Sequence, residues 1–176
     1  GLRHELAGSE YAQRQQECRA AVEFFGALHP AVQALRDVSP AMAEQQAANL
    51  PPIVARRVRH VVSENERTLA AADALRRNDL ETLGRLLDAS HASLRDDYEV
   101  SCRELDRLVE IVRSVSGVLG ARLTGGGFGG CMVALAHRAS LPEIEKRVCC
   151  EYDAVGYGPA RLLIARPGQG ATPLLA

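Results

Sequence analysis

Apolar residues recur every three or four positions through the first two thirds of the chain, which is the spacing of one face of an α-helix. The first such stripe consists of Tyr11, Gln15, Cys18, Val22, Phe25 and Leu28. It predicts a helix over 9–28 that ends before Pro30. The same spacing predicts a short helix over 40–49, a long helix from Pro52 to about Asn78, and two further helices from about 79 and 103.

Polar residues at the expected helix starts predict where these helices begin. Ser39 precedes Pro40, the order of an N-cap followed by the first helical residue. Asn78 is predicted to cap the helix that follows it. Ser101 and Ser140 each stand three residues before a glutamate, the spacing of a capping box.

The last third of the chain changes to the shorter period of β-strands. Strands are predicted at 118–123, 131–137 and 161–166, with one helix beginning after Ser140. Helices followed by strands indicate an α+β fold, in which several helices pack on a small antiparallel sheet.

Composition narrows the class of protein. The chain has 176 residues, of which 47% are apolar, and a net charge of −1. It can therefore bury a core, and it has no global positive charge with which to hold nucleic acid or an anionic membrane. No window of 18 apolar residues predicts a membrane span, and the charged residues 3–5 do not fit a signal peptide.

Cysteine and histidine usage argues against disulfides and metal sites. Five cysteines, an odd number without a C-x-x-C pair, indicate free thiols in a reducing, cytoplasmic compartment. The histidines lack zinc-site spacing, so no metal ligand is predicted. His60 and Glu64 are interpreted as a surface pair on the long helix. His91, Ser93, Asp96 and Asp97 are interpreted as an inter-helix loop with local hydrogen bonds, in preference to a catalytic triad or a Mg²⁺ site.

The most unusual segment is a glycine loop, residues 124–130, between two predicted strands. It consists of Thr124, Gly125, Gly126, Gly127, Phe128, Gly129 and Gly130. A strand follows the loop where a dinucleotide-binding fold would have a helix, and the loop lacks the Gly-Lys-Ser/Thr of a Walker loop. Two readings stay open: a backbone nest that accepts phosphate oxygens, or a hairpin that lets two elements pack closely.

Five segments, in order along the chain, together resemble the galactokinases, a branch of the GHMP kinases. They are residues 2–14 (LRHELAGSEYAQR), 35–38 (LRDV), 57–65 (RVRHVVSEN), 90–102 (SHASLRDDYEVSC) and 124–131 (TGGGFGGC). The last resembles the third motif of the GHMP kinases in its galactokinase form. The resemblance implies an ATP-dependent kinase that phosphorylates galactose at its anomeric hydroxyl.

The resemblance also implies how the chain is organised. It places residues 1–176 in the C-terminal domain, with a helical part at about 9–116, a strand and glycine-loop part at about 117–167, and a tail at 168–176. The N-terminal domain, expected outside this chain, would supply the ATP phosphate loop, the Mg²⁺ ligands and the catalytic residues. No catalytic or metal-binding residue is therefore expected here, and the partners are galactose, ATP and that N-terminal domain.

Three sets of site residues follow from the resemblance. Tyr11 matches the tyrosine that touches the sugar in galactokinases, although its place on an apolar stripe also fits a core residue. Arg3 matches a basic residue on the approach to the sugar. Residues 124–130 match the loop that packs beside the phosphate loop. Two alternatives remain: a non-catalytic sensor of sugar and ATP, and a GHMP kinase for another small alcohol or sugar, such as N-acetylgalactosamine.

Overall fold

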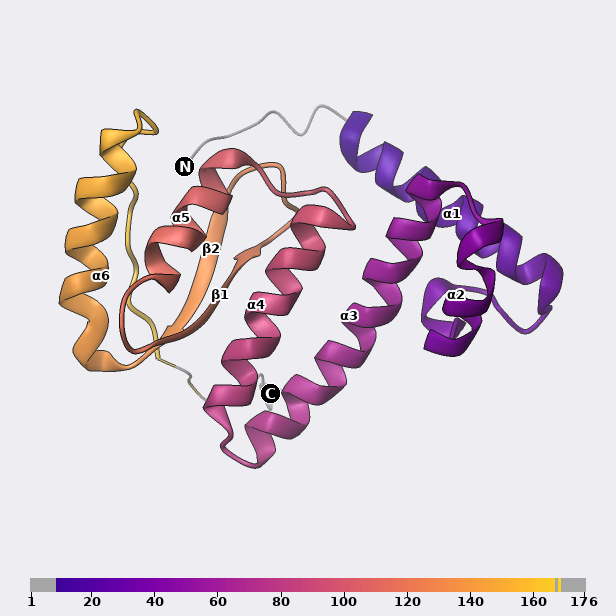
Figure 1. Ribbon diagram of the computed structural model, residues 1–176, viewed down its shortest axis with the longest axis horizontal. Coiled ribbons are helices and arrows are strands. Elements are labelled where there is room, and N and C mark those ends of the chain that lie inside the picture. Colours follow the sequence, from indigo (N-terminus) through magenta and orange to yellow (C-terminus); the bar gives the residue numbers. More distant parts are fainter. Residues whose placement is uncertain (1–8, 167, 169–176) are drawn as a thin grey trace, which may run out of the picture.

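The computed structural model describes residues 9–166 and 168, and helices make up most of that part (Figure 1). The helices are α1 (Ser9–Leu28), α2 (Pro40–Gln46), α3 (Pro52–Arg76), α4 (Leu80–Asp96), α5 (Arg103–Arg113) and α6 (Leu141–Arg147). Two strands, β1 (Val118–Thr124) and β2 (Cys131–Ala136), form an antiparallel sheet. The predicted class, several helices on a small antiparallel sheet, is confirmed.

The elements follow one another across the molecule in an order close to that of the chain (Figure 1). Helices α1 and α2 lie at one end, α3 and α4 run side by side in the middle, and α6 lies at the other end beyond the sheet and α5. None of the helices in the part described is long and apolar enough to cross a membrane.

One hydrophobic core joins α1, α2 and α3. Its buried members are Ala21, Phe25, Val32, Leu35, Val38, Leu50, Val54, Val58 and Val62. The predicted stripe on α1 supplies Phe25, while Cys18 and Val22 are partly buried against the same core. The 3.6-residue period of α1 and α3 thus brings two apolar faces together.

A second core lies between α5, α6 and the sheet, and a third lies beneath the glycine loop. The second contains Ile111, Val112, Val115, Ile144, Val148 and Tyr152. The third contains Leu94, Val100, Leu105 and Leu123, with Phe128 packed against it. The glycine loop therefore rests on buried side chains of α4, α5 and their connection.

Helix α4 lies against β1 at a distance that only glycine allows. A Cβ on Gly84 would lie 2.1 Å from the carbonyl oxygen of Leu119, and a Cβ on Gly120 would lie 2.0 Å from the carbonyl oxygen of Gly84. At this close approach the Asp88 carboxylate accepts the backbone N–H of Ala121 at 2.9 Å. Helix side chains therefore satisfy strand backbone groups that β2 does not pair.

Two of the predicted helix starts can be compared directly with the structure. The Ser39 hydroxyl accepts the backbone N–H of Met42 at 3.2 Å, which confirms it as the cap of α2. The prediction for Asn78 is wrong. Asn78 instead adopts a left-handed backbone with φ of +54°, and the next residue, Asp79, caps α4 by accepting the N–H of Thr82.

Both predicted capping boxes are also wrong, because each serine hydroxyl bonds elsewhere. Cys102, not Ser101, stands at the N-cap of α5, and the Ser101 hydroxyl donates to the carboxylate of Asp106 at 2.5 Å. Ser140 does stand at the N-cap of α6, but its hydroxyl donates to the carbonyl of Ser116 at 2.7 Å. Each hydroxyl therefore bonds to an acceptor other than the backbone that a capping box requires.

The predicted third strand at 161–166 is not formed. These residues follow an irregular path, and the sheet of the described residues contains β1 and β2 alone. Leu163 and Ile164 are 78% and 72% exposed. Without a paired neighbour, the apolar pattern of this segment has no sheet face on which to pack.

Candidate functional site

The glycine loop turns through a series of left-handed backbone conformations. The φ angle is +91° at Gly125, +81° at Gly127, +124° at Gly129 and +92° at Gly130. Phe128 shares this region, with φ of +58°. A residue with a Cβ rarely adopts such φ angles, so the turn itself requires glycine at most of these positions.

The inner side of the loop is packed against the connection between α4 and α5, residues 97–102. The backbone N–H of Phe128 donates to the carbonyl of Val100 at 2.7 Å. A Cβ on Gly127 would lie 2.4 Å from that same oxygen. The close-packing reading of the glycine run therefore holds at Gly127.

The outer side of the loop is open. A Cβ on Gly125, Gly126 or Gly130 would meet no atom within 4 Å. Gly126 is also outside the left-handed region, so neither strain nor crowding in the described residues requires glycine there. A bare backbone at this place leaves room for the close approach of a ligand or another segment.

A buried arginine, Arg57 of α3, ties the α4–α5 connection to α1. It is 1% exposed, and it donates to Glu17 at 2.6 Å, to the carbonyl of Asp97 at 2.6 Å and to the Glu99 carboxylate at 2.7 Å. The hydrogen bond from Arg57, opposed by partial burial, lowers the pKa of Glu99. Burial would raise the pKa of Glu17, but the bond from Arg57 lowers it. Both carboxylates are thus held ionised.

Arg14 of α1 joins the same connection to the glycine loop. Its guanidinium donates to the carbonyl of Tyr98 at 2.7 Å and to the carbonyl of Glu99 at 2.9 Å. The same group lies over the Phe128 ring, with Cζ 5.8 Å from the ring centroid. Arg14 therefore contacts both the α4–α5 connection, on which the glycine loop rests, and Phe128 of the loop itself.

His60 is buried, so its interpretation as a surface residue is wrong. It is 5% exposed and stacks on Tyr98, with ring centroids 4.5 Å apart. Its Nδ1 lies 3.0 Å from the Ser93 hydroxyl, which donates to the Asp97 carboxylate at 3.1 Å. Because that hydroxyl is already donating, neutral His60 carries its proton on Nδ1. Burial lowers its pKa to about 4.

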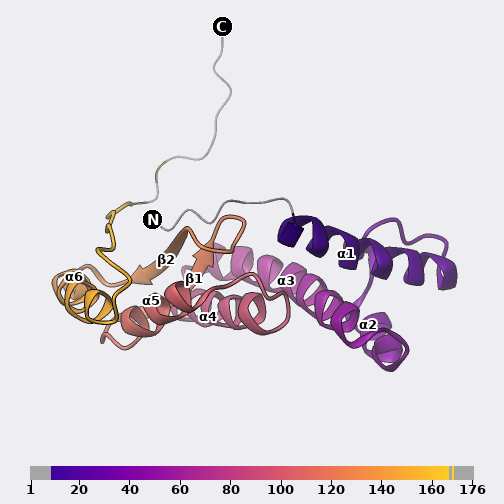
Figure 2. The same cartoon turned by 90° about the horizontal axis from the view of Figure 1, so that it is seen from above.

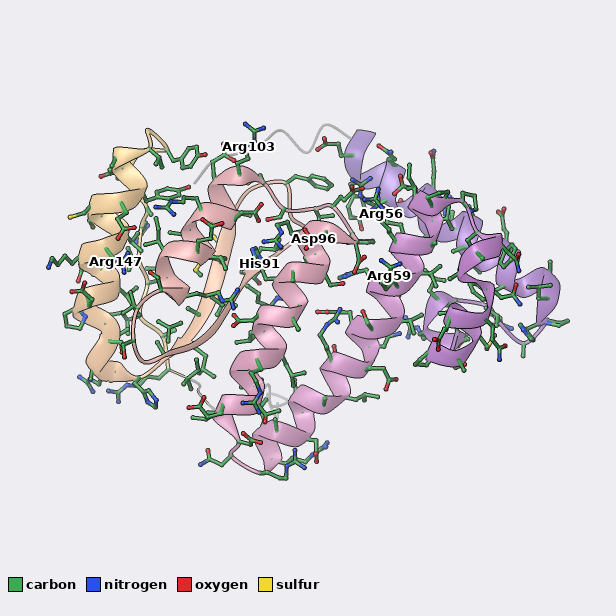
Figure 3. All side chains as sticks on the ribbon, viewed as in Figure 1. Arg56, Arg59, His91, Asp96, Arg103 and Arg147 are labelled. Carbon is green, nitrogen blue, oxygen red and sulfur yellow. The ribbon has the colours of Figure 1, made fainter. Side chains whose placement is uncertain are left out.

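His91 lies on α4 and not in a loop, and it faces β1 (Figure 3). Its Nδ1 accepts the backbone N–H of Leu123 at 3.3 Å, while its Nε2 lies 3.4 Å from Asp106 and makes no hydrogen bond within the described residues. Burial lowers its pKa, which keeps it neutral. His91 and Ser93 therefore bond to different partners and form no catalytic triad. Asp96, at the end of α4, pairs with Arg95.

Tyr11 projects from the first turns of α1 and is 55% exposed, so it is not a core residue. It stands one helical turn before Arg14, on the same face of α1. Figures 1 and 2 both place the N-terminal end of α1 beside the loop that joins β1 and β2. Arg3, the other residue predicted to approach a sugar, lies outside the described residues.

The family model of the GHMP kinase C-terminal domain matches residues 71–154, which include α4, α5, the sheet and the glycine loop. Galactokinase from Lactococcus lactis, solved in complex with galactose, aligns over 89% of this chain with 40% identity and a TM-score of 0.81. Residues 71–154 therefore form a GHMP kinase C-terminal domain. Mevalonate kinase from L. major, solved with R-mevalonate, shares the fold at 22% identity over 89% of the chain, with a TM-score of 0.51.

The chain spans less than half the length of each of these two kinases. The alignment covers 41% of the galactokinase chain and 38% of the mevalonate kinase chain. Within residues 9–166 and 168, no group of three or more His, Cys, Asp or Glu side chains is placed to hold a metal ion.

The arginines that organise the site were not predicted from the sequence. A signal was present, because Arg14 and Arg57 each interrupt an apolar stripe, three residues after Tyr11 and Val54 respectively. A charged residue at a position that faces the core is expected to be paired. The sequence did not reveal that both arginines bond to the same six-residue connection.

Proposed function

We propose that the complete protein that includes this chain is a galactokinase, which transfers a phosphoryl group from ATP to the anomeric hydroxyl of galactose. The observation that carries this proposal is the 40% identity, across 89% of the chain, to a galactokinase solved with galactose. The exposure of Tyr11 beside an open glycine loop supports it, because both features lie where a second domain could meet them.

Tyr11 would contact the sugar. Its exposed ring offers a flat apolar face, and its hydroxyl can donate or accept one hydrogen bond. Sugars present both kinds of surface, because the C–H groups of the ring form an apolar patch and the hydroxyl groups project from its edge. Arg3 would lie on the approach to the same sugar.

Residues 124–130 would close the phosphate side of the site. Thr124, Gly125, Gly126 and Gly130 are exposed, and an added Cβ on any of these three glycines would meet no atom within 4 Å. Phosphoryl transfer depends mainly on positioning and charge neutralisation, so a rigid loop that packs beside a phosphate-binding segment would contribute through placement. The catalytic base and the Mg²⁺ ligands would belong to the N-terminal domain of the same protein, which we expect to act in the cytoplasm.

A coupled ADP-release assay on the complete protein tests the proposal. We expect turnover with galactose and ATP-Mg²⁺, and none with this chain alone. Turnover by this chain at about 1 s⁻¹, near the low end for kinases, would contradict the assignment of catalysis to another domain. Galactose binding without turnover would favour the sensor, and faster turnover of N-acetylgalactosamine would favour a different sugar kinase.

A further inference from the structure

We propose that Arg14 is a positioning residue, which fixes the glycine loop relative to the first turns of α1, where Tyr11 stands. The inference rests on the proposed function, because it assigns to Arg14 the alignment of the sugar-contacting tyrosine with the phosphate-side loop.

Every nitrogen of the Arg14 guanidinium is engaged. Nε donates to the Tyr98 carbonyl at 2.7 Å, Nη2 to the Glu99 carbonyl at 2.9 Å, and Nη1 to the Glu17 carboxylate at 3.2 Å. The residue is only 9% exposed. Its Cζ lies over the Phe128 ring, 5.8 Å from the ring centroid. A group whose three nitrogens all donate hydrogen bonds has little freedom to move.

The two carbonyl groups that Arg14 binds flank a strained residue. Glu99 has φ of +56°, in the left-handed region that residues with a Cβ rarely adopt. The next residue, Val100, supplies the carbonyl that accepts the N–H of Phe128. Holding the backbone at Glu99 therefore holds the acceptor on which the glycine loop rests.

Arg14 also fixes the position of Tyr11 relative to the glycine loop, because the two residues lie on the same helix. Residues three apart lie on the same face of a helix, about 4.5 Å apart along its axis. Each contact of Arg14 with the loop therefore constrains the first turns of α1. Arg57 also reaches this connection, but it bonds to one backbone carbonyl only, that of Asp97. Arg56 bonds to the Glu99 carboxylate at 2.8 Å, and Arg59 to the Asp97 carboxylate at 3.0 Å (Figure 3).

The planar guanidinium group of arginine is essential for Arg14 to position the glycine loop. A lysine at position 14 would keep the positive charge beside Glu17, but its single ammonium lacks the planar fork that bonds two carbonyls and covers an aromatic ring at once. Arg14→Lys therefore removes the geometry and keeps the charge. Arg56→Lys is the matched control, because it makes the same chemical change on a residue that bonds to the side chain of Glu99 and not to its backbone.

The first readout is hydrogen exchange at the Phe128 amide of the complete protein. Loss of one hydrogen bond, worth about 1 kcal/mol, corresponds to roughly fivefold faster exchange. We expect at least that acceleration in Arg14→Lys and less than about twofold in Arg56→Lys. Equal exchange in the two variants would overturn the proposal, and this readout does not depend on which substrate the protein uses.

The second readout separates positioning from a purely structural role. Kinetics are measured at a temperature where both variants are fully folded by circular dichroism. Misplacement of reacting groups by about 1 Å can cost about 100-fold in rate, so kcat should fall about 10- to 100-fold in Arg14→Lys, with KM for galactose changed less than about threefold. A lower melting temperature with unchanged kcat would overturn the proposal. If the wild-type protein phosphorylates no galactose, the proposed function fails and the exchange data alone decide on Arg14.

Discussion

Gly127 lies so close to Val100 that a Cβ added to the glycine would be 2.4 Å from the Val100 carbonyl oxygen and 2.7 Å from its Cβ. The same carbonyl accepts the N–H of Phe128. Because one of the clashing atoms is the backbone oxygen of Val100, a rotamer change alone cannot make room for a side chain at position 127. Gly126, its neighbour, has open space on the side where a Cβ would lie.

These two glycines should respond differently to the same substitution. Gly127→Ala combines a left-handed φ of +81° with the clash on Val100, so we expect a loss of about 1–3 kcal/mol in the free energy of unfolding. Gly126→Ala should change it by less than about 0.5 kcal/mol. If another segment packs on the open side of the loop, Gly126→Ala should nevertheless lower the turnover of the complete protein.

Urea denaturation and the coupled assay, applied to both variants, check this pair of expectations. A stable Gly126→Ala protein with full activity would show that the open side meets neither ligand nor domain. Equal stability of the two variants would contradict the packing described for Gly127.

Tyr11→Phe tests the proposed sugar contact by removing one hydroxyl and keeping the ring. A neutral hydrogen bond contributes about 0.5–1.5 kcal/mol, so galactose binding to the complete protein should weaken by roughly threefold to tenfold. ATP affinity should hardly change. Isothermal titration with each ligand measures both effects, and Tyr157→Phe, beside Tyr152 and the distant helix α6, serves as the control. Unchanged galactose affinity would remove Tyr11 from the site.

The burial of His60 predicts how stability depends on pH. Burial lowers its pKa to about 4, whereas an unfolded histidine has a pKa of about 6.5. The unfolded chain therefore binds the proton more tightly, so the stability due to neutral His60 is complete above pH 6.5 and is lost as the pH falls toward 4. The loss should be at most about 3 kcal/mol.

Denaturation curves between pH 7 and pH 4 measure this loss. The charged groups that influence His60 are Glu64, Arg67, Asp97 and Arg122. His60→Gln should lower stability at pH 7 and flatten the dependence on pH. A residual slope is expected from His91, whose pKa burial also lowers. An unchanged slope in His60→Gln would show that its protonation is not linked to folding.

Gly84→Ala should separate helix propensity from close packing. Alanine favours a helix over glycine by about 1 kcal/mol, but at position 84 its Cβ would lie 2.1 Å from the Leu119 carbonyl oxygen. We therefore expect a net destabilisation of several kcal/mol, on the order of 3. Gly26→Ala in α1 is the control, since its nearest neighbour would be 3.4 Å away and its stability should be equal or higher. Thermal unfolding measures both, and equal melting temperatures would contradict the close contact of α4 with β1.

Much of the fold and part of the site could be predicted from the sequence. The stripe from Cys18 to Leu28 specified α1, and the change of period near Val118 specified β1, because both signals act between residues close in the chain. The run of glycines marked the loop for the same reason: the backbone angles of a tight turn depend on the residues within it.

Only the tertiary structure decided the features that depend on partners far apart in the chain. Tyr11 continued the stripe of α1 and yet is exposed, while Arg14, three residues later, is buried by carbonyl groups more than eighty positions away. His60 is buried with Tyr98 stacked on its ring, and the hydroxyl of Ser140, at the N-cap of α6, bonds to the distant carbonyl of Ser116 and not to the helix. Burial and hydrogen bonding are properties of the assembled fold, since a polar group takes the partner that the packed chain brings nearest.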